Sequence, residues 1–300
     1  VLLLFQIGLP SLGNDEAAYA YRVGLTWEHM WEVLAQDNYP PLYFVLLKYY
    51  VSAAGLGEVA LRLTSVPFAL LSWLVFIPFV RQHLKPLAAE LAIPLVVFSP
   101  LLLFLGRIAK YYSLMGFLTI ASVVLLWKIL EDQRERPLRS CWGWIALWGI
   151  GSLALIYIHY MGAVVWWAMG LWLVYTGLRW RDGRAWRLFG ILCVFFLAYL
   201  PQIPHILHRT VGSDDAAEVV LADSSTIRRL VAQGGYTAYS FAVGHTLEPG
   251  HLIVAGLACA VAGGAFLAGL WYIVKRWRSN ETPDRVLRFL LFQSVVMMGG

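Results

Sequence analysis

The sequence predicts an all-α, polytopic helical membrane protein. Hydrophobic residues make up 60% of the 300 residues and charged residues only 14%, whereas soluble domains carry about 25% charged residues. Apolar runs of about 18–22 residues recur along the chain, and a helix needs about 20 apolar residues to cross a bilayer. The short connectors between these runs are rich in Lys and Arg. Together these observations predict a bundle of membrane-spanning helices.

The expected membrane spans are apolar segments that follow one another along the chain. They cover residues 1–9, 59–80, 87–105, 113–130, 141–158, 160–178, 188–207, 251–274 and 286–300. Because the sequence begins with Val1 inside one apolar run and stops inside another, we expect a single transmembrane domain over residues 1–300 that is cut at both ends.

The connectors between the spans indicate the orientation in the membrane. Most of the 23 Lys and Arg residues fall in four connectors, at residues 81–85, 128–139, 179–187 and 275–288. Positive charge concentrates in the cytoplasmic loops of membrane proteins. We therefore expect the N-terminus inside, and residues 10–58 and 208–250 as two long loops outside.

The first outer loop is expected to hold helices that do not cross the membrane. Residues 19–34 contain Trp27 and Trp31 among charged residues, a pattern typical of a helix lying on a membrane surface. Pro41–Ala54 is apolar, but about 14 residues rising 1.5 Å each extend roughly 21 Å, less than a hydrocarbon core of about 30 Å. Because Lys48 also lies in the middle of this segment, we expect a juxtamembrane or re-entrant helix.

An acidic pair, Asp15 and Glu16, follows the first apolar segment. Carboxylates are costly near hydrocarbon and usually face a cavity, a partner or an ion path. The alternative interpretation is that Asn14 or Asp15 only caps the helix that follows. A further acid, Asp37, lies about 20 residues on, before a proline-rich stretch. Two acidic sites on one extramembrane loop indicate chemistry at the membrane surface.

A basic and aromatic stretch, residues 107–113, lies between two expected spans. Arg107, Lys110 and Tyr111 are three to four residues apart and would share a helical face. Two fixed cations with flanking hydroxyls, Tyr112 among them, suit a phosphate at headgroup depth. The alternative is that these side chains only anchor helix ends at the interface. Both interpretations stay open at this point.

His159 and Tyr160 lie at an expected tight outer turn. A lone histidine is more often a hydrogen-bonded structural residue than a ligand. Beside the carboxylates of the first outer loop, it could instead help to bind a metal or orient an acceptor. A divalent metal ion bridging Asp15 or Asp37 to a phosphate is compatible with the residues but not required by them. The acidic residues of the 208–250 loop are interpreted as a solvated surface.

A series of short motifs follows in a recognisable order. The motifs are Asn14-Asp15-Glu16-Ala17-Ala18-Tyr19-Ala20, Asp37-Asn38-Tyr39-Pro40-Pro41-Leu42-Tyr43, Ala60-Leu61-Arg62-Leu63 with Ser65, Ser99-Pro100, Ala109-Lys110-Tyr111-Tyr112-Ser113-Leu114, and His159-Tyr160. Their order and spacing resemble the membrane glycosyltransferases of the GT-C superfold, specifically the bacterial family 39 branch related to protein O-mannosyltransferases and lipid A aminoarabinose transferase. The resemblance covers the whole chain.

The resemblance implies a GT-C-like bundle with juxtamembrane helices in the first outer loop. It also implies an enzyme of the bacterial inner membrane that transfers a sugar from a polyprenyl-phosphate donor lipid to an acceptor on the extracytoplasmic side. Asp15 then matches the catalytic acid, with Glu16 beside it. The phosphate-binding candidates are Arg107, Lys110 and Tyr112, and the acceptor or metal-site candidates are Asp37, Tyr39, His159 and Tyr160.

Two departures from the family pattern matter. Tyr39 replaces the usual His, which removes an expected metal ligand or acceptor contact. Lys110 stands where the family often has Arg, which keeps the charge but loses the bidentate fork for phosphate. In the expected mechanism, Asp15 takes a proton from the acceptor hydroxyl in a partly dry cavity, and the cations stabilise the leaving phosphate in a single inverting displacement.

Two other classes of function compete with a transferase. A polyprenyl-phosphate transporter or flippase would use the same cations without transferring sugar, and a non-catalytic scaffold would only bind lipid. The acids cluster at the outer boundary rather than at mid-membrane, which favours surface chemistry. The expected partners are the donor lipid, membrane lipids and an acceptor, which is a lipid, a glycan or a protein hydroxyl, with no nucleic acid.

Overall fold

The computed structural model describes residues 2–5, 7–8, 11–36, 40–132, 134–202, 271, 285–286, 288–290 and 292–293. These residues form helices, turns and short connections and contain no strand, so the predicted all-α class is confirmed for this part of the chain. The α-helices are α1 Asn14–Gly24, α2 Trp27–Gln36, α3 Leu42–Ala54, α4 Glu58–Leu63, α5 Val66–His83, α6 Pro86–Val97, α7 Pro100–Leu105, α8 Tyr112–Trp127, α9 Trp142–Ile158, α10 Gly162–Trp180 and α11 Gly183–Leu197.

Three helical stretches are long and apolar enough to cross a membrane. They are Glu58–His83 with 26 residues, Tyr112–Glu131 with 20 and Leu138–Ile158 with 21. At 1.5 Å per residue, 20 residues extend about 30 Å, which matches the hydrocarbon core of a bilayer. These stretches coincide with the predicted spans at 59–80, 113–130 and 141–158.

Two other predicted spans correspond to helices that fall short of this standard. The 160–178 segment forms α10, with 19 residues, and the 188–207 segment begins within α11, with 15 residues. The tryptophans and glycines of α10 make it less apolar than the three spanning stretches, and α11 has too few residues to cross the hydrocarbon core. The predicted spans at 1–9, 251–274 and 286–300 lie wholly or partly outside the described residues.

The predicted span at 87–105 is interrupted, because it consists of two short helices, α6 and α7. Pro100 disfavours a helical conformation at the residue before it and has no N–H to donate to the preceding turn. Ser99 lies at the break, where its Oγ accepts a hydrogen bond from the backbone N–H of Leu102 at 3.5 Å. A Ser followed by Pro is the usual start of a new helix, so the prediction of one continuous span was wrong.

The predicted surface helix at residues 19–34 is also two helices, α1 and α2, with a break at Leu25 and Thr26. Leu25 has extended backbone angles (φ −64°, ψ 167°). The Thr26 hydroxyl accepts a hydrogen bond from the backbone N–H of His29 at 3.3 Å, which starts α2. The short helix expected at 41–54 is confirmed as α3.

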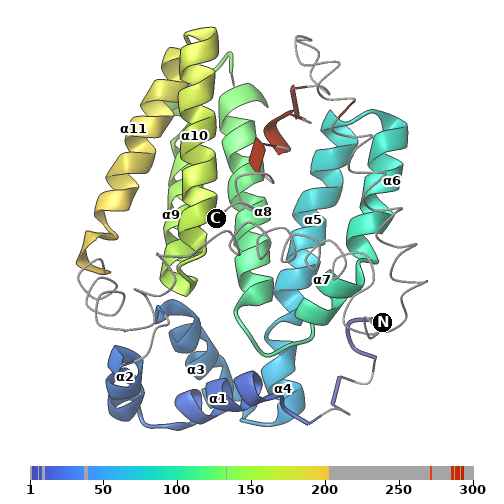
Figure 1. Cartoon of the computed structure of the whole chain (residues 1–300), viewed down its shortest axis with the longest axis vertical. Helices are drawn as coiled ribbons and strands as arrows, with labels where there is room; N and C mark the ends of the chain where they lie inside the picture. Colours follow the sequence, from blue (N-terminus) through green and yellow to red (C-terminus); the bar gives the residue numbers. More distant parts are fainter. Residues whose placement is uncertain are drawn as a thin grey trace, which may run out of the picture. The chain divides into compact units, whose positions relative to one another are not determined.

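The chain divides into two compact units. Described residues of the first unit lie within Val1–Phe79, Leu105–Pro201 and Phe292–Gly300, and those of the second lie within Val80–Phe104 and Gln202–Leu291. In the first unit, α8 to α11 pack side by side, and α1, α2 and α3 lie together near one end of α8, α9 and α10 (Figure 1). The candidate site lies entirely in this first unit.

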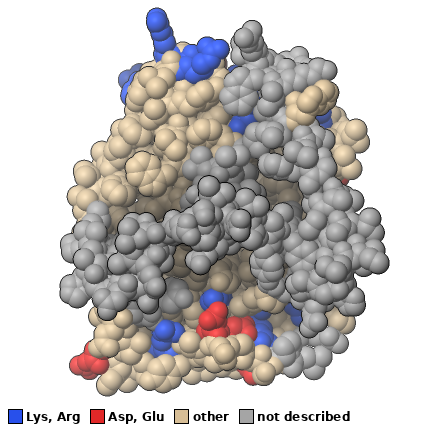
Figure 2. Space-filling view, in the orientation of Figure 1, with Lys and Arg blue, Asp and Glu red and all other residues tan. Residues whose placement is uncertain are grey.

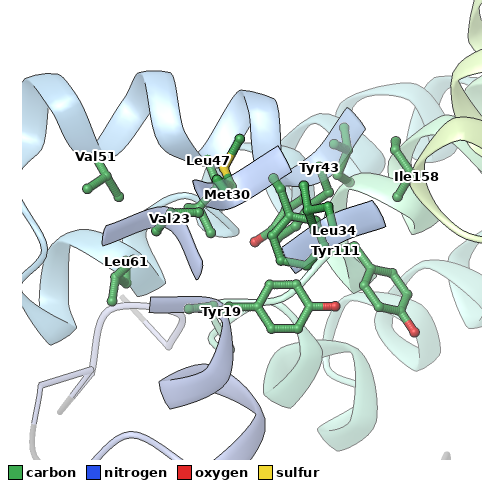
Figure 3. Close-up of a cluster of buried hydrophobic side chains, with 13 residues drawn as sticks. Tyr19, Val23, Met30, Leu34, Tyr43, Leu47, Val51, Leu61, Tyr111 and Ile158 are labelled. Atoms are coloured by element: carbon green, nitrogen blue, oxygen red, sulfur yellow. The ribbon is translucent and has the colours of Figure 1, made fainter. Parts of the chain in front are cut away.

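A buried core joins the short helices to the ends of α8 and α9 (Figure 3). We call it the α1–α4 core, and its members are Tyr19, Val23, Met30, Leu34, Tyr43, Phe44, Leu47, Val51, Leu61, Ala109, Tyr111, Leu114 and Ile158. Within α1, α2 and α3 these residues recur every four positions, as in Tyr43, Leu47 and Val51, so each of the three helices buries an apolar stripe. The opposite faces of α1 and α2 remain exposed.

Lys48 lies in the middle of the apolar helix α3, where a charge is unexpected. Its ammonium donates hydrogen bonds to the carbonyl of Val23 at 3.1 Å and to that of Leu25. It also lies 5.2 Å from the centroid of the Trp27 ring. Carbonyls at the end of a helix lack partners within the helix, so Lys48 satisfies the end of α1 and fixes α3 against the α1–α2 break.

Candidate functional site

Several of the predicted site residues lie in or beside the connection between α7 and α8, residues 106–111. This connection is a turn and not a helix, so the prediction that Arg107, Lys110 and Tyr111 share a helical face was wrong. The turn is tight, because the backbone N–H of Lys110 donates to the carbonyl of Ile108 at 2.8 Å. Such a turn orients its side chains through tertiary contacts rather than through helical periodicity.

Three polar side chains hold the backbone of this turn. The Ser65 hydroxyl contacts the carbonyl of Ile108 and that of Lys110, the latter at 3.5 Å. The Ser113 hydroxyl donates to the carbonyl of Leu105 at 3.0 Å. Glu16 accepts the N–H of Ala109 at 2.9 Å. Helix α1, the α4–α5 junction and α8 therefore all help to position the turn.

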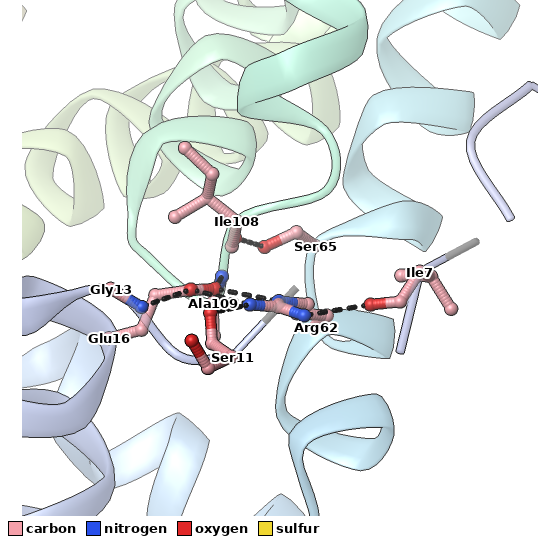
Figure 4. Close-up of polar contacts among 8 residues, drawn as sticks. All are labelled: Ile7, Ser11, Gly13, Glu16, Arg62, Ser65, Ile108 and Ala109. Carbon is pink, nitrogen blue, oxygen red and sulfur yellow. Dashed lines mark hydrogen bonds and ion pairs between the residues drawn. The ribbon is translucent and has the colours of Figure 1, made fainter. Parts of the chain in front are cut away.

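Glu16 and Arg62 form a buried ion pair at the centre of these contacts (Figure 4). The Arg62 Nη2–Glu16 Oε2 distance is 2.9 Å, the Arg62 Nε–Glu16 Oε1 distance is 3.1 Å, and their side chains are only 6% and 8% exposed. Arg62 also donates to the carbonyls of Ile7 at 2.9 Å and Ser11 at 3.1 Å. Because the pair is bidentate and satisfies further backbone groups, each charge is well compensated.

The surroundings of Glu16 stabilise its ionised form. Burial alone would raise the pKa of this carboxyl group, but the hydrogen bond and charge of Arg62 and the N–H groups of Ala109 and Gly13 together hold the pKa below its usual value. The N–H of Gly13 donates to Glu16 at 3.1 Å and precedes α1. Glu16 therefore caps α1 in the role that the sequence interpretation assigned to Asn14 or Asp15.

Asp15 points away from this network and pairs with Lys110. The Lys110 Nζ–Asp15 Oδ2 distance is 2.7 Å, and Nζ lies 3.0 Å from the Tyr112 hydroxyl. The Lys110 side chain is 8% exposed and that of Asp15 is 73% exposed. The partly dry cavity expected around Asp15 is therefore not formed by the described residues. Acidic and basic atoms lie together at the lower end of the face in Figure 2, where Figure 1 draws α1.

Lys110 is a fixed, largely buried positive charge with one donor left over. Burial alone would lower the pKa of its ammonium, but the hydrogen bonds to Asp15 and Tyr112 and the charge of Asp15 outweigh burial and raise it. An ammonium has three N–H donors. Among the described residues, Asp15 and Tyr112 accept two of them, which leaves the third for an anionic oxygen.

His159 completes this group of residues. It caps the C-terminal end of α9 in the predicted turn, and its ring stacks on Tyr111 with centroids 4.4 Å apart and planes 16° apart. Tyr111 is in turn 4.6 Å from Tyr112, between ring centroids. Burial and then the charge of Lys110 lower the pKa of His159. Its Nδ1 accepts the N–H of Met161 at 3.2 Å, so the neutral ring carries its proton on Nε2.

The remaining candidates are not part of this group. Arg107 donates to the carbonyl of Phe5. Tyr160 has no contact with the Lys110 group among those described, and its ring centroid lies 6.1 Å from that of His159. Asp37 and Tyr39 lie outside the described residues.

The described residues do not form a metal site. Within the part of the chain that the structure describes, no three His, Cys, Asp or Glu side chains lie close enough together to hold a metal ion. Asp15, one of the two carboxylates considered for such an ion, is paired with a lysine instead, and the other, Asp37, lies outside the described residues.

Two residues that organise the site had no role assigned from sequence. Arg62 and Ser65 were recognised only as parts of a motif, yet they hold Glu16 and the α7–α8 turn. One signal was available for Arg62, because an arginine at the edge of an apolar segment usually has a specific partner. Its partner, 46 residues away, could not be identified from spacing.

Comparison with known proteins adds no assignment. A scan against models of protein families finds no match, and a search of curated proteins finds none either.

Proposed function

We propose that this chain is a GT-C-type membrane glycosyltransferase that moves a sugar from a polyprenyl-phosphate donor to an acceptor hydroxyl. The observation that carries the proposal is the Asp15–Lys110–Tyr112 group, in which a carboxylate, an ammonium and a phenol meet within 3.0 Å contacts. The reaction needs a base for the acceptor and a cation for the leaving phosphate. This group offers both.

The leaving phosphate is assigned to Lys110 and Tyr112. Developing charge on a phosphate oxygen is stabilised by donors that are already in place. The third N–H of Lys110 supplies one donor. Because the Tyr112 hydroxyl oxygen accepts from Lys110, its own proton is free to be donated as a second. Both donors leave the Asp15–Lys110 contact intact while the phosphate is bound.

Asp15 is assigned as the base. A proton passes from the acceptor hydroxyl to the Asp15 carboxylate, and the acceptor oxygen bonds to the anomeric carbon. The bond between that carbon and the phosphate oxygen breaks, and its electron pair leaves with the lipid phosphate. One displacement inverts the anomeric centre. His159, stacked on Tyr111 next to Tyr112, is assigned to orient the acceptor or the sugar.

The distribution of charge supports an extracytoplasmic site. Lys110 precedes the first residue of α8, whereas the basic connector at 128–139 follows the last. A helix of 16 residues, such as α8, extends about 24 Å. By the positive-inside rule the basic connector faces the cytoplasm, so the proposed site faces the other side of a bacterial inner membrane.

The test of this function is an assay on the full chain in nanodiscs with a panel of polyprenyl-phosphate sugars. Release of polyprenyl phosphate from one donor, dependent on an acceptor, is the expected result. Binding of the lipids without release from any donor would contradict the proposal and favour the transporter or scaffold alternative. Movement of labelled lipid between leaflets distinguishes those two.

The role of Lys110 predicts that two substitutions at this position differ in their effect on turnover. Lys110→Met removes the cation and is expected to lower turnover by about 10²–10³, the usual effect of losing one donor to developing charge. Lys110→Arg keeps the charge and offers a planar fork for phosphate, so the Arg variant is expected to retain most of the turnover that the Met variant loses. The measurement is the release rate at saturating donor. Lys85→Met, which removes an exposed lysine, is the control, and equal rates for the Met and Arg variants would exclude the phosphate role.

A further inference from the structure

A second polar site lies at the other end of α8, in the first unit. A pocket of about 540 Å³ is lined by residues of the α8–α9 and α10–α11 connections, namely Arg134, Glu135, Arg136, Pro137, Leu138, Asp182, Gly183, Arg184 and Arg187. Four of these residues are arginines and two are acids. Its volume lies in the range of about 300–1,000 Å³ that is usual for small-ligand sites. The proposed transferase mechanism does not use this pocket.

Arg184 places a buried positive charge beside the pocket. The residue is 7% exposed. Its Nε donates to the carbonyl of Ile129 at 2.8 Å, its Nη1 to that of Arg136 at 2.6 Å, and its Nη2 to the sulfur of Cys141 at 3.5 Å. None of these three acceptors is a carboxylate, so the hydrogen bonds orient the guanidinium without neutralising it.

Of the two acids that line the pocket, Asp182 forms an ion pair, whereas Glu135 forms none with any residue that the structure describes. Asp182 pairs with Arg134 at 3.1 Å, and its other oxygen accepts the N–H of Arg184 at 2.8 Å at the start of α11. Arg134 is therefore compensated. Arg136 and Arg187 are exposed and form no ion pair with any residue that the structure describes. The Arg187 Nε donates to the carbonyl of Gly183 at 3.2 Å, so the two Nη groups of Arg187 and the Arg136 guanidinium remain for an anion in the pocket.

Aromatic residues near the pocket indicate where it lies relative to a bilayer. Trp142, Trp144 and Trp186 are 60%, 40% and 42% exposed, and Lys128 lies 3.8 Å from the centroid of the Trp144 ring. Exposed tryptophans beside basic residues are typical of the headgroup level of a membrane protein. Basic side chains also gather at the upper end of the face in Figure 2, above α10 and α11 in Figure 1.

We propose that this pocket binds the phosphate headgroup of an anionic phospholipid. Arg136 and Arg187 donate hydrogen bonds to the phosphate, and Arg184 adds a fixed positive charge beside the pocket. Guanidinium groups bind phosphate in a bidentate manner. Basic pockets between helices at the cytoplasmic side are suited to anionic lipid headgroups. The tryptophans supply the apolar rim against which the rest of the lipid lies.

The test is native mass spectrometry of the full chain in detergent, titrated with phosphatidylglycerol or with phosphatidylcholine. The pocket variant is Arg136→Gln/Arg187→Gln. The control variant is Arg139→Gln/Arg179→Gln, which removes two exposed arginines that do not line the pocket. Each arginine near an anionic surface contributes roughly fivefold in affinity. The pocket variant is therefore expected to bind phosphatidylglycerol about 30-fold more weakly, and the control close to wild type.

Three results would overturn the proposal. The first is an equal fall in the affinity for phosphatidylglycerol in both double variants. The second is an affinity that is unchanged in both. The third is binding of inorganic phosphate alone at this pocket as tightly as phosphatidylglycerol, which would make the site one for a free anion. A further variant is Arg136→Glu, which is expected to leave the fold intact because the side chain is exposed. It replaces a positive charge with a negative one, so it is expected to weaken phosphatidylglycerol binding more than Arg136→Gln alone.

Discussion

Replacing Asp15 with Asn is expected to lower acceptor-dependent release of polyprenyl phosphate by about 10²–10⁴, the usual contribution of a positioned general base. Asn has the same shape and can still accept a hydrogen bond from the Lys110 ammonium, so the 2.7 Å contact and the fold are expected to survive. An amide cannot take the proton of an attacking hydroxyl. The measurement is release from a saturating donor, with donor binding recorded in parallel.

The matched control for this substitution is Glu28→Gln. Glu28 is an exposed acid on the neighbouring helix α2, so the control makes the same change of charge without touching the Lys110 group. The control is expected to release polyprenyl phosphate at the wild-type rate. Turnover of the Asp15→Asn enzyme within about twofold of wild type would show that Asp15 is not the base, while the release of polyprenyl phosphate would still show a transferase.

Replacing Glu16 with Gln is expected to lower the free energy of unfolding by about 3–5 kcal/mol, the usual cost of removing one partner of a buried ion pair. The substitution keeps the shape of the side chain but leaves the Arg62 charge without its carboxylate in a site that is 6% exposed. It also weakens the bond to the N–H of Ala109, which holds the α7–α8 turn. The measurement is reversible unfolding in mixed micelles, or the thermal midpoint in nanodiscs.

A double-mutant cycle separates this ion pair from general damage. Arg62→Gln is expected to destabilise the protein by a similar amount, because it strands the buried carboxylate. The double variant Glu16→Gln/Arg62→Gln is then expected to lose much less than the sum of the two, since no uncompensated charge remains. Strict additivity of the two losses would mean that the two side chains do not interact in the folded protein.

The same carboxylate predicts how stability depends on pH. Because the pKa of Glu16 is lower in the folded protein than its ordinary value of 4.5, the unfolded chain binds its proton first on acidification. The stabilisation is complete above pH 4.5 and is lost as the pH falls through the folded pKa. Wild type is expected to lose stability in that acidic range, and Glu16→Gln is expected to lose less of it. Parallel pH profiles for the two proteins would contradict this prediction.

Long apolar runs were the most reliable part of the sequence prediction. The runs at 59–80, 113–130 and 141–158 form helices of spanning length, because burying an apolar surface of that length requires no partner residue in particular. The breaks were missed. At Leu25–Thr26 and at Ser99–Pro100, hydroxyl caps and a proline interrupt hydrophobic patterns that are continuous in sequence. Local capping therefore overrode periodicity.

The residue types of the candidate site were also readable from the sequence, but their pairing was not. Asp15, Lys110, Tyr112 and His159 were all candidates, and the structure brings the first three into direct contact. Helical spacing nevertheless predicted the wrong geometry for residues 107–111, because the turn is held by Ser65 and Glu16 and by its own Lys110-to-Ile108 backbone hydrogen bond rather than by a helical ladder.

By itself, the sequence determined the all-helical class, the helices long and apolar enough for a membrane, and the polar residues available for chemistry. Composition and hydrophobic periodicity decide these features locally. Only the tertiary structure decided that Glu16 is buried against Arg62 while its neighbour Asp15 faces solvent and Lys110. Contacts across 46 and 95 residues depend on how helices pack, and packing is the result of the whole chain burying its apolar faces together.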